Sequence, residues 1–417
     1  MQVELAFGKT QQTADVAEHN LLAVLAPNPL NADGPRGQAA VLAALANPIG
    51  TPRVGAVVRP GERVAIITSD ITRPFPSWQV LPPLLDELAA AGVSMADVTV
   101  VFALGSHRRH TEAEMRKLVS DDVFARVRCL DHDPADSVRM GVSARGTPYD
   151  VFRPVAEADR RICLGNIEYH YFAGYSGGAK AIMPGVCTRD AIQTNHAMMV
   201  KPEARAGNLT GNPVREDIDE VLSVCPVDFI VNVVLSEHKE ILHAVCGHAI
   251  HAHRAGCAFL DTLYKVRIPA RADIVLVSPG GYPKDINLYQ AQKALDNAKH
   301  AVRDGGVIVL CASCAEGLGE DVFERWMTQS PSTRHMTEQI QRRFELGGHK
   351  AAAIGLVMEK SSVYLVSDLP AGFVSAIFFT PFPTLNAACR AAQAALGGDA
   401  SVIVMPYGGS TLPEVAP

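Results

Sequence analysis

The sequence predicts an α/β protein with two domains, each built on a mostly parallel sheet flanked by helices. Apolar runs typical of buried strands alternate with helix-like segments along the chain, which favours this class. The length of 417 residues exceeds what one ordinary core accommodates. A short proline-containing linker at residues 267–272 separates two such alternating blocks, so we expect two domains.

In the first block, residues 63–69 are expected to form a buried strand and residues 77–91 a helix. Residues 97–104 read as the next strand, and a helix opens at Thr111, with Glu114 at the spacing of a capping box. Both strands end directly in polar residues. Because ligands of open parallel sheets bind beyond the carboxyl ends of the strands, these two loops are expected to carry chemistry.

The second block predicts a βαβ-type domain of its own. The expected strands cover residues 273–278, 306–311, 352–357, 363–366 and 401–405, and the expected helices cover residues 287–303, 321–328 and 384–396. The predicted domains are 1–268 and 273–404, with an active site in the cleft between them. We expect the tail, residues 407–417, to return to the N-terminal domain.

Composition limits the classes of function. Hydrophobic residues make up 48%, charged residues 20%, and the formal net charge is −6, which argues against nucleic-acid and anionic-membrane partners. The start lacks a basic region followed by an apolar run, and no apolar stretch approaches about 18 residues. Nine scattered cysteines are typical of reduced thiols. We therefore expect a cytoplasmic protein with no membrane span.

The loops after the first two strands hold the first candidates. Asp70, Thr72 and Arg73 could cap the following helix, or Arg73 could clamp a carboxylate through two hydrogen bonds. His107 follows the second strand directly and is a candidate general base, and Gly105 allows close backbone approach. The neighbouring residues, Arg108, Arg109 and His110, could be solvated loop residues only.

A glycine-rich segment at residues 168–185 is the most informative part of the chain. It suggests a phosphate-binding loop, yet Ala179 and Ala181 flank Lys180, which does not fit the nucleoside triphosphate template. The glycines indicate close backbone approach to something flat or anionic. A lysine in this apolar setting should have a lowered pKa, as a covalently reacting amine requires.

Residues 280–294 leave a strand end and enter a helix. Gln290 and Lys293 are three residues apart and share one face near the helix start, so they could line a site. An exposed amphipathic helix explains the same spacing equally well.

Three further patterns carry no predicted site. His248, His251 and His253 lie in a helix-like stretch, and we interpret them as surface or structural residues because His253 does not share the face of the other two. Cys311 and Cys314 have CxxC spacing without a second pair, so zinc is not expected. No nicotinamide-binding glycine fingerprint surrounds Gly306, which disfavours a dehydrogenase.

At these residues the sequence resembles the nickel-pincer lactate racemase family over nearly the whole chain. The resemblance runs through residues 70–74, 103–108, 170–185, 280–287 and 405–409. It implies a nickel-pincer nucleotide, a pyridinium-3-thioamide-5-thiocarboxylate mononucleotide, linked covalently to Lys180. The fourth nickel ligand falls on His196 and the two acid/base histidines on His107 and His170. Arg73 and Lys293 correspond to substrate-orienting cations. The other expected cofactor-site positions are Asp70, Gly105, Ser176, Gly177, Gly178, Pro184, Tyr289 and Gln290.

The chemistry implied by the resemblance suits these residue types. Taking the α-hydrogen of a 2-hydroxyacid as hydride yields a stable ketoacid and requires an organic acceptor that side chains do not provide. A base is needed for each enantiomer, which two histidines supply. A lactate-like substrate is the first expectation. The alternatives are malate, a longer or aromatic hydroxyacid, or a sugar acid such as gluconate, and a carrier that only stores the cofactor. Cofactor-biosynthesis proteins are the expected maturation partners.

Overall fold

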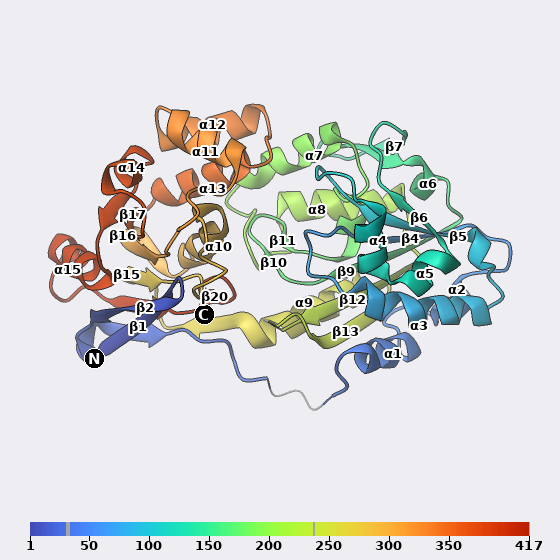
Figure 1. Cartoon of the computed structure of the whole chain (residues 1–417), viewed down its shortest axis with the longest axis horizontal. Helices are drawn as coiled ribbons and strands as arrows, with labels where there is room; N and C mark the ends of the chain where they lie inside the picture. Colours follow the sequence, from blue (N-terminus) through green and yellow to red (C-terminus); the bar gives the residue numbers. More distant parts are fainter. Residues whose placement is uncertain (31–33, 237, 417) are drawn as a thin grey trace. The chain divides into compact units, whose positions relative to one another are not determined.

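The computed structural model describes residues 1–30, 34–236 and 238–416. The chain divides into two compact units, Met1–Leu30 with Thr262–Pro417 (unit 1) and Asn31–Asp261 (unit 2). Figure 1 shows both units coloured along the sequence. The first 30 residues thus belong with the C-terminal part of the chain, whereas the sequence placed them in the range 1–268. Residue 417, the last of the predicted tail, lies outside the described residues.

Unit 2 is built on a six-stranded sheet in which one edge strand, β13, runs antiparallel to its neighbour β12 and the other pairings are parallel. Its order is β13 (Ile241–Gly247), β12 (Phe229–Leu235), β9 (Arg160–Asn166), β4 (Val64–Ser69), β5 (Val98–Ala103) and β6 (Arg128–Asp131). The central strand β4 is buried almost throughout, with Ile66 opposite Val100 and Ile162. A continuous apolar run is expected for a parallel strand covered on both faces.

Helices cover both faces of this sheet (Figure 1). The helices before β7 are α1 (Gln38–Ala46), α2 (Val54–Val57), α3 (Ser77–Ala90), α4 (Glu112–Val119) and α5 (Asp121–Arg126). Next come the hairpin of β7 (Ser137–Val142) and β8 (Pro148–Phe152), and α6 (Arg153–Ala156), α7 (Arg189–His196), α8 (Pro213–Glu220) and α9 (His251–Tyr264). Leu81 and Leu84 of α3 pack with Ile66 and Val100 in one buried core. The predicted capping box of α4 is confirmed, because Thr111 and Glu114 cap each other's backbone amides.

Unit 1 contains a six-stranded sheet whose pairings are all parallel. Its order is β18 (Thr380–Phe382), β17 (Ser362–Val366), β16 (Val302–Cys311), β15 (Ala272–Val277), β19 (Val402–Met405) and β3 (Leu21–Val24). The edge strand β3 comes from the chain's start, which explains why residues 1–30 belong here. In the tail, β20 (Leu412–Val415) pairs in parallel with β14 (Lys265–Ile268) of the same unit.

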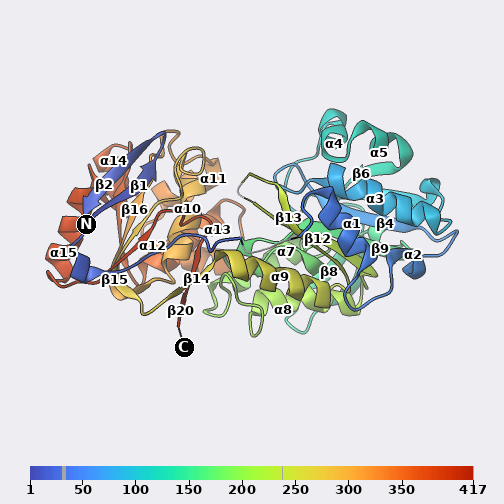
Figure 2. The same ribbon diagram turned by 90° about the horizontal axis from the view of Figure 1, so that it is seen from below.

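The faces of this sheet are covered by different elements. The hairpin β1 (Gln2–Phe7) and β2 (Thr10–Asp15) lies beside α15 (Leu385–Leu396), as Figure 2 shows, and Leu5, Leu276 and Cys389 share one core there. The remaining helices are α10 (Leu288–Ala298), α11 (Asp321–Gln329), α12 (Thr333–Arg342), α13 (Gly348–Met358) and α14 (Ala371–Ala376). Short 3-10 turns, η1 to η5, cover Glu18–Asn20, Met95–Asp97, Gly178–Ala181, Ala197–Val200 and Val221–Ser223.

The predicted α/β class with mostly parallel sheets is confirmed, but one of the predicted strands is wrong. Residues 352–357, expected as a strand, lie in the C-terminal part of helix α13. This helix contacts α10, α11 and α12, and nearly all of its residues are buried. A helix that is apolar all round has no periodicity to distinguish it from a buried strand. No helix in the described ranges is long and apolar enough to cross a membrane.

Candidate active site

Three loops that carry predicted site residues leave the same edge of the unit 2 sheet. They follow β4, β5 and β9, which are parallel neighbours in the sheet order. The carboxyl ends of parallel neighbours lie at one edge, so the loops meet there. The long segment after β9 holds the short strands β10 (Tyr169–His170) and β11 (Gly174–Tyr175) and the turn η3 (Gly178–Ala181).

His107 and Asp70 form a hydrogen-bonded pair at this edge. Nδ1 of His107 bonds Oδ2 of Asp70, a carboxylate that is only 2% exposed. Asp70 also accepts from the amide of Thr72 at 3.0 Å and from its hydroxyl at 2.7 Å. Burial alone raises the pKa of Asp70, yet its hydrogen bonds with His107 and Thr72 and the nearby positive charge outweigh burial, and the net pKa is lowered. An ionised Asp70 fixes the proton of neutral His107 on Nδ1, which leaves Nε2 to accept a proton.

Arg73 belongs to the same turn as Asp70. Its amide donates to the carbonyl oxygen of Asp70 at 3.1 Å, and its side chain is exposed. Its positive charge lowers the pKa of both Asp70 and Lys180. Arg73 therefore lies near both groups and remains available to a ligand.

The loop that carries His107 is attached to the segment that carries Lys180. The amide of Gly105 donates to the carbonyl oxygen of Gly185 at 2.9 Å, and Gly105 has a φ of +56°, which favours glycine. A Cβ on Gly105 would lie 4.0 Å from the carbonyl oxygen of Pro184. A Cβ on Gly185 would lie 2.2 Å from the carbonyl oxygen of Ala181, so only glycine fits there. These contacts fix the distance between the two loops.

Lys180 lies in the turn η3 and has an unusually acidic ammonium. Burial, followed by the charges of Arg215 and Arg73, lowers the pKa of Lys180 to about 7. The side chain nevertheless keeps some exposed surface. A lowered pKa is what its apolar neighbours predicted, and it makes a large share of the amine neutral near neutral pH. Lys180 can therefore act as a nucleophilic amine.

Two buried side chains bind the backbone carbonyl oxygens of the glycine turn before Lys180, and the sequence did not predict either contact. Arg215 of α8 is fully buried and donates to the carbonyl oxygens of Tyr175 at 3.2 Å and Gly177 at 3.4 Å. Nε2 of His253 bonds the carbonyl oxygen of Ser176 at 2.7 Å. The charged helix sequence around Arg215 resembles a solvated face, and its carbonyl partners lie far away in sequence, so no local signal reveals its role.

Ser176, Gly177 and Gly178 are shaped by contacts inside the protein. The Ser176 hydroxyl donates to the carbonyl oxygen of Asn166 at 2.7 Å. Gly177 and Gly178 have φ values of +77° and +61°, and the Gly178 amide donates to Oδ1 of Asn232 at 2.8 Å. A Cβ on Gly177 would lie 2.8 Å from the same oxygen. Glycine is required here because the turn packs closely on β12.

His170 and His196 both contact the aromatic ring of Phe172. The ring centroid of Phe172 lies 4.5 Å from that of His170 and 4.9 Å from that of His196, both edge-on. His196 is buried, and its Nδ1 bonds Oδ1 of Asn195 at 2.8 Å. That bond places the proton of neutral His196 on Nδ1. Nδ1 of His170 accepts the amide hydrogen of Ala173 at 3.2 Å, so neutral His170 carries its proton on Nε2.

Tyr289, Gln290 and Lys293 lie on α10 of unit 1. Asn287 caps this helix by accepting the amide hydrogen of Gln290 at 3.0 Å. Gln290 and Lys293 are exposed, while Lys350 lies 3.9 Å from the Tyr289 ring centroid and donates to its carbonyl oxygen at 2.5 Å. The shared helical face predicted for Gln290 and Lys293 is present. Their joint action with the unit 2 residues stays a prediction.

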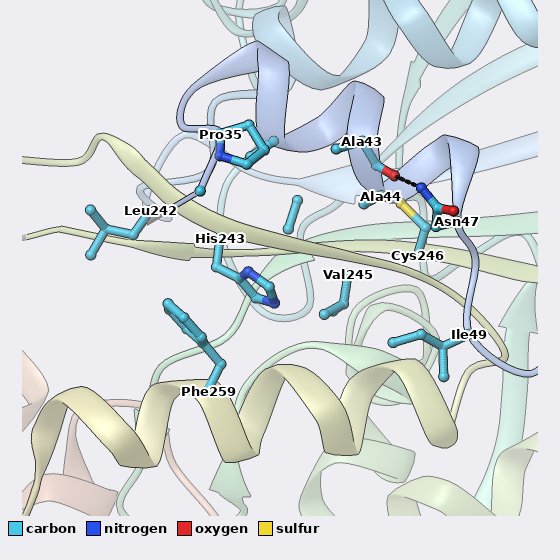
Figure 3. Close-up of a pocket in the computed structure, with 13 residues that line it drawn as sticks. Pro35, Ala43, Ala44, Asn47, Ile49, Leu242, His243, Val245, Cys246 and Phe259 are labelled. Carbon is cyan, nitrogen blue, oxygen red and sulfur yellow. Dashed lines mark hydrogen bonds between the residues drawn. The ribbon is translucent and has the colours of Figure 1, made fainter. Parts of the chain in front are cut away.

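A separate cavity lies elsewhere in unit 2 (Figure 3). It has a volume of about 450 Å³ and is lined by α1, the edge strand β13 and Phe259 of α9. The ring of His243 stacks on Phe259 with centroids 4.1 Å apart, and burial lowers the pKa of His243. Its lining includes none of the predicted site residues, so we place the candidate site at the strand ends.

The remaining histidine and cysteine candidates occupy different surroundings. His248 and His251 are exposed and stack with ring centroids 4.4 Å apart, whereas His253 is buried. Cys311 and Cys314 are buried, and burial raises the pKa of both thiols.

Comparison with known proteins identifies the family. The family model of the lactate racemase N-terminal domain matches residues 7–207, and that of the lactate racemase C-terminal domain matches residues 268–412. This chain belongs to the lactate racemase family. The membership makes it an isomerase of the racemase class and confirms the resemblance found in the sequence.

Relatives match over almost the whole chain. The chain is 32% identical to a lactate racemase of Thermoanaerobacterium thermosaccharolyticum over 421 residues, covering 98% of both proteins. It is 30% identical to a lactate racemase of Lactiplantibacillus plantarum over 418 residues, covering 97% of this chain and 98% of the relative. The structure of the T. thermosaccharolyticum lactate racemase apoprotein superposes with a TM-score of 0.89 at 31% identity, covering 99% of this chain and 100% of that one. A Thermotoga maritima crystal structure, with a TM-score of 0.60 and 18% identity, covers 87% of this chain and 96% of that one and shares the fold.

Proposed function

We propose that this protein racemises or epimerises a 2-hydroxyacid by reversible hydride transfer, with a lactate-like acid as the first candidate substrate. The observation that carries the proposal is the bond between Nδ1 of His107 and the buried carboxylate of Asp70, which leaves Nε2 of neutral His107 able to accept a proton. His170, the second predicted acid/base residue, lies in the segment after β9, at the same edge of the sheet. In each direction one histidine would accept the hydroxyl proton in its neutral form and the other would donate from its cationic form, and the two roles would exchange for the other enantiomer.

The residues fit the nickel-pincer nucleotide that the sequence implies. Lys180 supplies an amine with a pKa of about 7 for the covalent thioamide link, and His196 supplies a buried nitrogen oriented by Asn195 for the metal. Within the described residues, no group of three or more His, Cys, Asp or Glu side chains could hold a metal ion. Nickel would thus need ligands from the nucleotide itself. When bound, this group supplies the hydride acceptor that side chains lack.

The surrounding side chains would orient the substrate. The exposed guanidinium of Arg73 suits a bidentate contact with the substrate carboxylate, and Lys293 is the second predicted cation. In each direction, one histidine would take the hydroxyl proton and the other would return a proton to the product. Tyr289 and Gln290 are the residues we propose beside the substrate in unit 1. Maturation would require the proteins that make and load the nucleotide.

The same head-group chemistry applies to several acids. Arg73, His107 and His170 address only the carboxylate and hydroxyl, which lactate, malate, longer hydroxyacids and gluconate share. A carrier that stores the nucleotide is the other candidate, but it would need Lys180 and His196 without an acid/base pair.

The deciding experiment measures racemisation by the nucleotide-loaded protein. Each enantiomer of lactate, malate, 2-hydroxybutyrate and phenyllactate, and gluconate for epimerisation, would be followed by chiral chromatography. We expect interconversion of at least one acid, and none by a loaded His107→Ala, His170→Ala double variant. A loaded wild-type protein that interconverts no acid in a broad panel, while retaining nickel, would support the carrier instead.

A further inference from the structure

His110 is a buried histidine with a defined partner at each ring nitrogen. Its side chain is 1% exposed, and Nδ1 bonds Oδ1 of Asp131 at 2.6 Å. The other carboxylate oxygen of Asp131 accepts the backbone amide hydrogen of His110 at 2.7 Å. Nε2 of His110 lies 3.0 Å from the backbone nitrogen of Ile71 and accepts its hydrogen. The sequence suggested that His110 could be a solvated loop residue, and the burial of its side chain corrects that interpretation.

These bonds connect three neighbouring strands. Asp131 ends β6, His110 follows β5, and Ile71 follows β4, and these strands are adjacent in the sheet. Ile71 lies inside the turn that the Arg73 amide closes on the carbonyl oxygen of Asp70. It directly follows Asp70, which binds His107. The connection therefore runs from the end of β6, past the loop of His107, to the turn on which His107 depends.

We propose that His110 and Asp131 form a positioning pair that holds the 70–73 turn, and through it the proton-accepting orientation of His107. The catalytic part of this inference rests on the proposed racemase function. Ile71 needs a lone pair on Nε2 of His110, and the anionic Asp131 needs a hydrogen on Nδ1, so His110 must be neutral and in the Nδ1–H form. A second hydrogen, on Nε2, would face the amide hydrogen of Ile71 and break that contact.

A packing role alone does not explain this arrangement. The ring of His110 does pack edge-on against Phe102, with centroids 5.2 Å apart, but an apolar side chain would serve that purpose. Burying an imidazole and a carboxylate is costly unless both are hydrogen-bonded, and both are bonded here. His132, one residue after Asp131, shows the contrast. It is 1% exposed, and within the described residues neither of its ring nitrogens has a hydrogen-bond partner.

The test combines a measurement on apoprotein with one on the loaded enzyme. Long-range proton–nitrogen NMR of the histidine rings in apoprotein should show His110 neutral with its hydrogen on Nδ1. In His110→Leu, the amide of Ile71 and the ring of His107 should both shift. His132→Leu is the matched control, because it also replaces a buried histidine and should leave both signals in place.

In the loaded enzyme, His110→Leu should lower kcat by about 10- to 100-fold, since small misplacement of a reacting group can cost about 10²-fold. His110→Gln, whose side-chain oxygen can accept from Ile71, should recover most of that loss, and His132→Leu should stay near wild type. The proposal is overturned if His110 carries its hydrogen on Nε2, or if His110→Leu and His132→Leu behave alike. A loaded wild-type protein without racemase activity would instead refute the proposed function, while the NMR comparison would still decide whether the pair positions the turn.

Discussion

The imidazole of His107 donates from Nδ1 to the buried carboxylate of Asp70, although the two residues are 37 positions apart in the chain. The parallel pairing of β4 with β5 brings them together, because each residue lies in the loop that leaves one of these strands. The bond stabilises the ionised form of the buried Asp70 carboxylate. It also orients the ring so that Nε2 is the nitrogen that can take a proton.

Asp70→Asn should therefore impair catalysis with little loss of fold. The amide can still occupy the same space, but it can present a hydrogen to Nδ1 and so favour the wrong form of neutral His107. We expect kcat to fall by about 10²-fold or more in both directions, within the range for losing a general base. Racemisation rates of the loaded variant test this, with circular dichroism as the check on folding. A kcat close to that of wild type would show that Asp70 does not set the state of His107.

Lys180 should react with amine reagents at an unusually low pH. Only the neutral amine reacts, and the pKa of Lys180 is lowered to about 7, so labelling should rise as the pH increases through about 7. Ordinary lysines should label with a midpoint near about 10.4. Acetylation of apoprotein across pH, read by peptide mass spectrometry, gives both midpoints. Arg73→Gln should move the Lys180 midpoint upward, because the charge of Arg73 contributes to the lowering. A wild-type midpoint near that of the other lysines would contradict this prediction.

The roles of Lys180 and His196 in holding the cofactor should separate in a loading experiment. Lys180→Ala should abolish the covalent adduct in the intact mass of loaded protein. His196→Ala should keep the adduct but lose nickel, because only the metal depends on its buried nitrogen. Intact mass and metal analysis of the same samples distinguish the two losses. A full adduct on Lys180→Ala would place the link on another residue.

Nickel alone should not activate the protein. A single histidine, His196, is too small a ligand set, and the described ranges contain no cluster of three metal-binding side chains. Apoprotein made without cofactor-biosynthesis partners should contain no stoichiometric nickel and should stay inactive after dialysis against nickel salt. Full activity restored by nickel salt alone would refute the requirement for the nucleotide.

The sequence predicts the strand ends well because apolar runs mark the strands and polar residues mark where they stop. It does not predict β3, whose partner β19 comes near the other end of the chain. It also mistakes α13 for a strand, since burial on all sides removes the helical period.

The same limit applies to the site. Asp70, His107 and Lys180 stand out locally, whereas the partners that hold them do not. Asp131, Arg215 and His253 act through contacts with residues far away in sequence, and nothing near them in the chain signals burial. Such supporting residues become visible only when the fold brings the strands and helices together.

The two histidines should differ in which enantiomer they serve. If His107 and His170 address opposite faces of the substrate, each enantiomer transfers its hydroxyl proton to only one of them. Loaded His107→Ala should then show the single-turnover absorbance change with one enantiomer, and loaded His170→Ala with the other. Steady-state racemisation should fall by about 10²- to 10⁴-fold in both variants, because each full conversion needs both residues.

Stopped-flow absorbance of each loaded variant against each enantiomer of the best substrate measures this directly. The fold should persist, because His107 lies in a loop with a side chain that is 25% exposed, and His170 ends a two-residue strand. Phe172→Leu is a useful companion, since its ring touches both His170 and His196 and its loss should weaken the signal with both enantiomers. If both histidine variants give equal absorbance changes with both enantiomers, the two-base mechanism is wrong, and one of the two histidines has only a structural role.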